Sequence, residues 1–320
     1  MQQGKRKKIV VIGGGTGLAT ILRGLKTVNI EITAIVTVAD DGGSSGILRE
    51  EMNMPPPGDV RNVLVALADK EPLLQSLFQH RFRNGNGLAG HSLGNLLIAG
   101  MQEITGDFVT AVKALSRVLA VRGNVLPAAN SSIRLVAEMA DGSIVVGESN
   151  IPKVNKKIHK VMLEPADIEA LPEAVQAIEE ADMILVGPGS LYTSIIPNLL
   201  VQEIQQALRD SQAQKIYVSN VMTQPGETDG YTVRDHIQAI YEHIQFPLFQ
   251  KAIVNNGEIP LNILKKYERK SAVPVRYHAG SLEDLEIEVI EDQLFLADDY
   301  LRHDAGKVTQ IVLQCINGMD

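Results

Sequence analysis

Glycine-rich turns are the parts of this chain best suited to chemistry, because glycine lets the backbone approach a phosphate closely. The first, Gly13-Gly14-Gly15-Thr16-Gly17, joins the apolar run Lys8 to Ile12 to a segment with helical spacing of leucine and isoleucine. A strand, turn and helix in this order present N–H groups and a helix dipole to an anion. The turn therefore predicts a phosphate site, although Leu18 or Thr20 replaces the third glycine of a dinucleotide fingerprint. A tight turn without a ligand is the alternative.

A second polar loop follows the β-branched run Ile30 to Val38. Because the carboxyl ends of parallel strands share one edge of a sheet, we expect this loop to lie beside the first turn. Its carboxylates are candidate ligands of Mg²⁺ or of ribose hydroxyls, and its small residues are candidate phosphate donors. A polar turn that caps the next helix is the alternative. The candidates are Thr37, Asp40, Asp41, Gly43, Ser44 and Ser45.

Two further segments open predicted helices. In Pro57-Gly58-Asp59-Val60-Arg61-Asn62 we expect Asp59 to be the N-cap, with Arg61 and Asn62 pointing toward the same edge. In the loop that ends in Gly90-His91-Ser92-Leu93-Gly94-Asn95, the side chains of His91, Ser92 and Asn95 are candidate ligand contacts. A structural role for His91, or one as a general acid or base, remains open.

The second half of the chain repeats the strand and turn design. Gly187-Pro188-Gly189-Ser190 follows the strand Met183 to Val186, and Ser219-Asn220 follows the strand Ile216 to Val218. Each is a candidate ligand loop at the carboxyl edge. Tyr267 and Arg302 add an aromatic face and a cation suited to a base or a diphosphate, with an exposed surface position as the alternative.

The elements that must position these residues predict an α/β, Rossmann-like three-layer fold with a mostly parallel sheet. Helical spacing dominates residues 59–120, and Asp141-Gly142 marks an antiparallel hairpin excursion near 132–148. No linker or repeat interrupts the chain, so we expect a single domain over residues 1–320.

Composition narrows the function classes. A net charge of −8, an aromatic content of 4% and the absence of tryptophan argue against nucleic-acid binding. One cysteine, Cys315, and the lack of a secretory or membrane-spanning segment predict a cytoplasmic protein without membrane contact. A monomer and a homodimer both fit this composition. The standard nucleotide P-loop, zinc-protease and hydrolase-elbow motifs are absent, which leaves phosphate cradles without an evident nucleophile.

Six motifs together resemble one bacterial family. They are V-I-G-G-G-T-G from Val11, A-D-D-G-G-S-S-G from Ala39, P-G-D-V-R-N from Pro57, G-H-S-L-G-N-L from Gly90, G-P-G-S-L-Y-T-S from Gly187 and S-N-V-M-T-Q-P-G-E-T from Ser219. This combination resembles the gluconeogenesis factor family, also called YvcK or GlmR, which is similar to the 2-phospho-lactate transferase (CofD) family. The resemblance covers essentially the whole chain.

The resemblance implies a cytoplasmic regulator that binds UDP-N-acetylglucosamine and is required for cell shape and cell-wall precursor supply during gluconeogenic growth. It implies no required cofactor, and a cell-wall precursor enzyme as the regulated partner. In the transferase relatives the matching loops hold a guanine nucleotide and a metal, which carries over to Asp40 and Asp41 as metal ligands.

Three hypotheses follow. The first is a nucleotide-sugar sensor without catalysis. The second is a phosphoryl or nucleotidyl transferase of the 2-phospho-L-lactate transferase type, with Asp40 and Asp41 positioning Mg²⁺. The third is a protein that binds NAD as an alternative ligand, which the incomplete glycine fingerprint disfavours.

Overall fold

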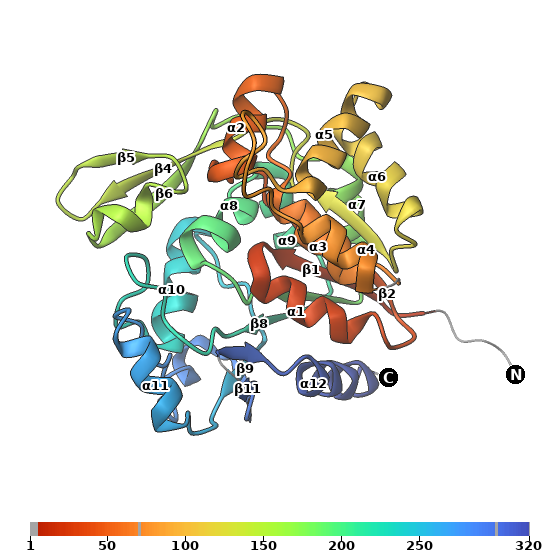
Figure 1. Cartoon of the computed structure of the whole chain (residues 1–320). Coiled ribbons are helices and arrows are strands. Elements are labelled where there is room, and N and C mark those ends of the chain that lie inside the picture. The colour runs from red at the N-terminus through yellow and green to blue at the C-terminus, as the bar shows by residue number, and fades with distance from the viewer. Residues whose placement is uncertain (1–5, 70–71, 298–299, 320) are drawn as a thin grey trace, which may run out of the picture.

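A parallel sheet forms the centre of the computed structural model, which describes residues 6–69, 72–297 and 300–319 (Figure 1). Seven strands lie in the order β10-β9-β8-β7-β1-β2-β3, and every neighbouring pair is parallel. Their apolar runs are buried, as is typical of a parallel sheet covered on both faces. The strands are β1 (Lys8–Gly13), β2 (Glu31–Val36), β3 (Asn124–Pro127), β7 (Met183–Val186), β8 (Gln214–Val218), β9 (Lys251–Asn255) and β10 (Glu288–Asp292).

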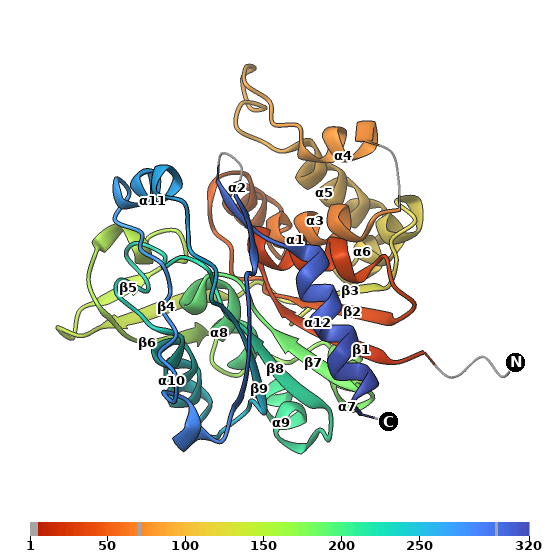
Figure 2. The same ribbon diagram turned by 90° about the horizontal axis from the view of Figure 1, so that it is seen from below.

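Helices cover the two faces of this sheet and complete the three predicted layers (Figure 2). On one face α1 (Gly15–Leu25) contacts α3 (Gly58–Leu67) and α12 (Ala305–Asn317); on the other α7 (Pro172–Glu179) contacts α9 (Gln202–Asp210). The steps from β1 to β2 and from β7 to β8 run in opposite directions along the sheet. Because both connections are right-handed crossovers, their helices lie on opposite faces. The other helices are α2 (Gly43–Met52), α4 (Pro72–Gln79), α5 (Leu93–Thr105), α6 (Phe108–Val118), α8 (Ile196–Leu199), α10 (Val233–Ile244) and α11 (Leu261–Glu268).

The strand order reverses between β1 and β7. From β1 the chain winds toward β2 and β3, and from β7 it winds the other way toward β8, β9 and β10. Ligands of open α/β sheets bind at such a reversal, outside the carboxyl ends of the strands. The two glycine turns follow these two strands.

The hairpin prediction is confirmed, but the hairpin belongs to a separate sheet. Strand β4 (Arg134–Met139) pairs antiparallel with β5 (Ile144–Val146) and also with β6 (Ile158–Glu164), in the order β5-β4-β6. In Figure 1 this small sheet projects from the main body. A two-stranded sheet, β11 (Phe295–Ala297) with β12 (Leu301–His303), also lies outside the sequence prediction, because three-residue strands leave little periodicity.

One predicted helix is interrupted. After the second glycine turn, where the spacing of apolar residues from Leu199 to Leu208 predicts one helix, a π-helical segment η2 (Leu191–Ile195) leads into α8, and α9 begins only at Gln202. The π-helical turn follows the second glycine turn directly, and such turns are frequent at functional sites. Within the described residues, every helix is too short or too polar to cross a membrane.

Candidate functional site

The two glycine turns touch each other at the reversal point of the sheet. A Cβ added at Gly17 would lie 3.1 Å from the carbonyl oxygen of Pro188, and one added at Gly189 would lie 3.2 Å from that of Gly14. Both distances are shorter than normal contacts of a side chain. The sequence therefore needs glycine here because two backbones approach closely, which is also the condition for a backbone to reach a ligand phosphate.

Two asparagines and one threonine hold these turns. Asn220, after β8, accepts from the N–H of Gly189 (3.0 Å) and donates to its carbonyl (2.8 Å). The buried Asn198 donates to the carbonyl of Gly13 (3.2 Å), which also accepts from the N–H of Thr37 (3.3 Å). Asn220 and Thr37 were predicted ligand residues, and the structure gives each of them a role in shaping a turn.

Asp59 does not cap its own helix. Helix α3 begins at Gly58 after an N-cap at Pro57, so Asp59 lies in its first turn and the N-cap prediction is wrong. Its carboxylate instead accepts from the N–H of Gly15, at the start of α1. A Cβ at Gly14 would lie 2.4 Å from Oδ2 of Asp59. The Asp59 carboxylate therefore stabilises the first glycine turn through this hydrogen bond and packs closely against Gly14.

The paired aspartates of the second loop point to different partners. Asp40 accepts from the N–H of Gly42 (2.9 Å), whereas Asp41 accepts from the N–H of Ser149 (2.8 Å), which follows β5. The sequence suggested one carboxylate pair, and the structure separates it: Asp41 joins the small sheet to the loop, and Asp40 lies near Gly58 at the start of α3.

Ser44, His91, Ser92 and Asn95 form a buried network behind this loop. Oγ of Ser44 lies 3.1 Å from Nδ1 of His91, and it accepts from the N–H of Ser92 (3.3 Å) and from Nδ2 of Asn95 (3.2 Å). Arg61, also buried, donates to Oδ1 of Asn95 (3.1 Å). These hydrogen bonds join the start of α2 to the starts of α3 and α5.

Ser45 is buried beside this network, since Nδ2 of Asn95 lies 3.4 Å from its hydroxyl. Gly43 opens α2 on the exposed side with a φ of 44°, a left-handed conformation that favours glycine. The loop thus has a buried half that fixes its shape and an exposed half that is open to a ligand.

A cavity of about 580 Å³ lies beside the first glycine turn. Four predicted residues line it, namely Thr16, Gly17, Asn62 and Arg302. Sequence reasoning missed Arg23, which also lines it, one turn of α1 beyond Thr20. The spacing of Thr16, Thr20 and Arg23 on one helical face was the available signal.

The far wall of this cavity is β12 and the residue before it. Nε2 of His303 lies 3.0 Å from the carbonyl oxygen of Ser219, which links the wall to the end of β8. The hydroxyl of Tyr267 accepts from the N–H of Leu301 (3.1 Å). Tyr267 therefore supports the wall from behind, while Tyr300 and Arg302 line the cavity itself.

Carboxylates gather at this edge and shift one another's pKa values. Burial, and next the charge of Asp40, raises the pKa of Asp59 to about 7. Burial, then Asp40 and Glu227, raises the pKa of Glu148 to about 8. Burial raises the pKa of Glu227 to about 7. Perturbed groups of this kind mark candidate functional sites.

The carboxyl group of Glu227, from the loop after β8, lies against the first residues of η2. Glu227 is 4% exposed, and its carboxylate accepts from the backbone N–H groups of Tyr192 and Thr193 and from the Thr193 hydroxyl (3.2 Å). The carboxyl group of Glu227 therefore occupies the place after the second glycine turn where the N–H groups of the helix start could bind a ligand anion. The carbonyl of Ser190 accepts from the N–H of Ser194 (2.9 Å). Glu227 belongs to the sequence motif that begins at Ser219, but no local pattern indicated that its carboxylate would lie here, and no motif included Glu148.

The acidic residues fit a magnesium ion only together with a ligand. Carboxylate oxygens suit Mg²⁺, which proteins often hold with one or two carboxylates plus substrate phosphates. Among the described residues, no three histidine, cysteine, aspartate or glutamate side chains are arranged to hold a metal ion. Asp40 accepts from the N–H of Gly42 through Oδ1, so its other oxygen, Oδ2, is the candidate ligand atom of such a shared site.

Comparison with known proteins identifies the family. The family model described as 2-phospho-L-lactate transferase CofD matches residues 9–295. A gluconeogenesis factor from Halalkalibacterium halodurans is 57% identical over 311 residues, which is 97% of both chains. The chain belongs to the gluconeogenesis factor family.

Other members of this gluconeogenesis factor family agree in sequence and in fold. The gluconeogenesis factor of Bacillus subtilis is 53% identical and covers 98% of this chain and 99% of its own. A crystal structure of a UPF0052 family member from Bacillus halodurans has a TM-score of 0.94 and 56% identity, over 97% of this chain and 99% of that one. The predicted Rossmann-like fold is therefore confirmed.

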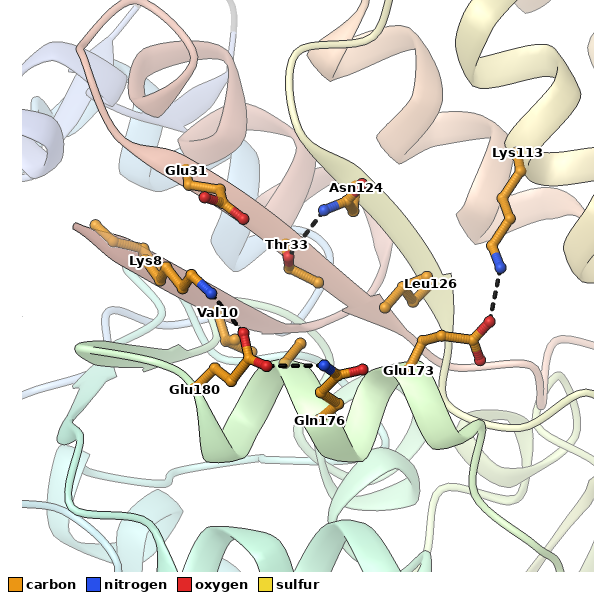
Figure 3. Close-up of a pocket in the computed structure, with 12 residues that line it drawn as sticks. Lys8, Val10, Glu31, Thr33, Lys113, Asn124, Leu126, Glu173, Gln176 and Glu180 are labelled. Carbon is orange, nitrogen blue, oxygen red and sulfur yellow. Dashed lines mark hydrogen bonds and ion pairs between the residues drawn. The ribbon is translucent and has the colours of Figure 1, made fainter. Parts of the chain in front are cut away.

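In this member of the gluconeogenesis factor family, another cavity, of about 230 Å³, lies at the opposite edge of the sheet (Figure 3). It lies at the starts of β1, β2 and β3, and four of its five charged side chains form ion pairs: Lys8 with Glu180, and Lys113 with Glu173 (2.7 Å). None of the residues predicted to bind a ligand lines it. The candidate site is therefore the carboxyl edge.

Proposed function

We propose that this protein binds a nucleoside diphosphate-sugar, with UDP-N-acetylglucosamine as the expected ligand. The observation that carries the proposal is the contact of two glycine turns at the reversal point of the sheet, beside a cavity with two arginines. The diphosphate would lie at the start of α1, and Arg23 and Arg302 would supply its positive charge. The cavity offers room for the rest of the nucleotide-sugar.

We further propose a regulatory role in the cytoplasm. The turns and cavity offer binding groups, and the relatives carry the name gluconeogenesis factor. Ligand binding would change a surface that contacts an enzyme of cell-wall precursor supply, and this would maintain cell shape during gluconeogenic growth. A ligand can do this by binding one of two conformations more tightly.

Thermal unfolding in the presence of candidate ligands tests the binding proposal. A ligand that binds only the folded state raises the melting temperature by mass action. We expect UDP-N-acetylglucosamine to raise it with saturation, and UDP alone to raise it less. A rise with NAD and none with any UDP compound would contradict the proposal.

A transferase is the second candidate, because Asp40, Asp59 and Glu148 gather beside the turns. Asp40 would hold Mg²⁺ together with ligand phosphates, and Asp41, through its hydrogen bond with Ser149, would position the loop. The ion would neutralise developing charge on the phosphates. If the protein is such an enzyme, replacing both aspartates by asparagine should abolish Mg²⁺-dependent turnover of a nucleoside triphosphate and a sugar phosphate. Turnover equal to that of the unmodified protein would exclude this mechanism.

A further inference from the structure

The small antiparallel sheet has one buried face and one exposed face. Leu135 and Ala137 of β4 and Val161 and Leu163 of β6 point inward and are buried. The side chains between them point outward, because successive residues of a strand alternate between faces. Figure 1 shows that this sheet projects away from the main body.

Apolar side chains form a row across the exposed face. Val136 pairs directly with Val146 on one side and with Met162 on the other, so the three lie side by side. Ile144 lies two residues before Val146 on β5, beside Glu138 of β4, and it is 57% exposed, with Val146 at 48%. We call these four residues the outer strip.

Opposite charges flank the outer strip. On one side Arg134 pairs with Glu164 (4.0 Å), and on the other Glu138 pairs with Lys160 (3.2 Å). The signs of the charges therefore alternate around the strip. On one flank β4 carries the positive Arg134 and β6 the negative Glu164, and on the other flank β4 carries the negative Glu138 and β6 the positive Lys160. An exposed apolar strip between charged pairs is typical of an interaction surface.

We propose that the outer strip binds the outer strip of a second copy of this chain. When a twofold axis runs along the row, Val136, Val146 and Met162 each face the same residue of the other copy, and the two sheets stack as in an aligned sandwich. This rotation exchanges the two flanks. Glu138 then faces Arg134 of the other copy, and Lys160 faces its Glu164. A twofold axis along β4 would instead oppose Glu138 with Glu138 and Arg134 with Arg134. An axis between β4 and β6 would leave Val146 without a facing strand, so charge and apolar contact together select the first arrangement.

The dimer is expected to be weak and concentration-dependent, because four apolar side chains cover only the centre of a standard interface. The flanking charges are exposed, so their contribution decreases with salt. The glycine turns follow strands of the other sheet, and no residue of the outer strip lines the cavity beside them.

Sedimentation velocity over a concentration series tests the proposal with two charge-swap variants. The first is Glu138→Lys with Lys160→Glu, and the second is Arg134→Glu with Glu164→Arg. Each variant keeps an ion pair within its own sheet, which serves as the folding control. Each would bring like charges together in its own dimer, so we expect the dimer dissociation constant to rise about tenfold or more.

Mixing the two variants gives the decisive result. In a mixed dimer all four facing pairs are again opposite in charge, so an equimolar mixture should dimerise as the unmodified protein does. The proposal is overturned if the unmodified chain remains monomeric at every soluble concentration. It is also overturned if the separate variants dimerise as strongly as the unmodified chain, or if the mixture does not dimerise.

Discussion

Arg23 and Arg302 are the residues on which the diphosphate proposal depends most directly. They line one cavity from α1 and β12, and burial, followed by the charge of Arg302, lowers the pKa of Arg23. Among the described residues neither forms an ion pair with a carboxylate. An anion between them would relieve the repulsion between their charges.

Removing either charge should weaken ligand binding. We expect Arg23→Gln and Arg302→Gln each to raise the dissociation constant of UDP-N-acetylglucosamine about tenfold, as loss of a charged hydrogen bond does. Calorimetric titration measures this. Arg117→Gln, on the exposed part of α6, is the matched control and should leave binding unchanged. Equal affinities of all three variants would show that the phosphates bind elsewhere.

At the scale of elements, the site depends on how closely the two glycine turns can approach. Gly14 has an extended φ of −169°, so a substitution there tests space and not backbone strain. An added Cβ would meet the Asp59 carboxylate and lie 3.1 Å from the Thr37 methyl. The turn is therefore constrained by its neighbours.

Alanine at this turn should destabilise the protein and disrupt the site. We expect Gly14→Ala to lower the free energy of unfolding by about 1–3 kcal/mol, as overpacking does, and to abolish the ligand-dependent rise in melting temperature. Gly100→Ala is the control, because a Cβ there meets nothing within 4 Å in the interior of α5. It should be neutral or stabilising. A Gly14→Ala protein as stable as the control would contradict the close packing.

The second turn depends on the two hydrogen bonds between Asn220 and Gly189. Asn220→Asp keeps the acceptor for the N–H of Gly189 but removes the donor to its carbonyl. We expect a loss of about 1–3 kcal/mol in chemical unfolding, together with weaker ligand binding. Asn86→Asp, on an exposed loop, should change stability by less than about 0.5 kcal/mol. A small effect at both positions would mean that the turn holds its shape without Asn220.

At the scale of the whole molecule, the carboxyl edge couples folding to pH. The pKa values of Asp59 and Glu227 are raised to about 7 and that of Glu148 to about 8, against about 4 in an unfolded chain. The folded protein therefore binds protons that the unfolded chain releases at neutral pH. The resulting stability is complete below about pH 4 and is lost as the pH rises through 7 to 8.

We therefore expect the free energy of unfolding to decrease between pH 5 and pH 8.5. Urea unfolding at fixed ionic strength measures this slope. Glu148→Gln should flatten it, because the amide has no proton to release, whereas Glu50→Gln, on the exposed side of α2, should leave it unchanged. A slope that is the same in all three proteins would show that Glu148 ionises as freely in the folded state as in the unfolded state.

The sequence by itself determined the local features of this protein. Glycine turns after apolar runs, the hairpin at Asp141-Gly142 and the helical spacing over residues 59–120 depend on neighbouring residues, and the structure confirms each of these elements. The motif combination also identified the family. Turn chemistry and periodicity are local properties, so one chain without a structure was sufficient for them.

Only the tertiary structure decided which side chains meet. Strand β7 lies beside β1 although more than half of the chain separates them, and that pairing brings Gly189 against Gly14. The same packing buries His91 behind Ser44, sends Asp59 to Gly15 and places Arg23 opposite Arg302. Burial and through-space charge depend on contacts between distant segments, and the spacing of residues along the chain does not encode them.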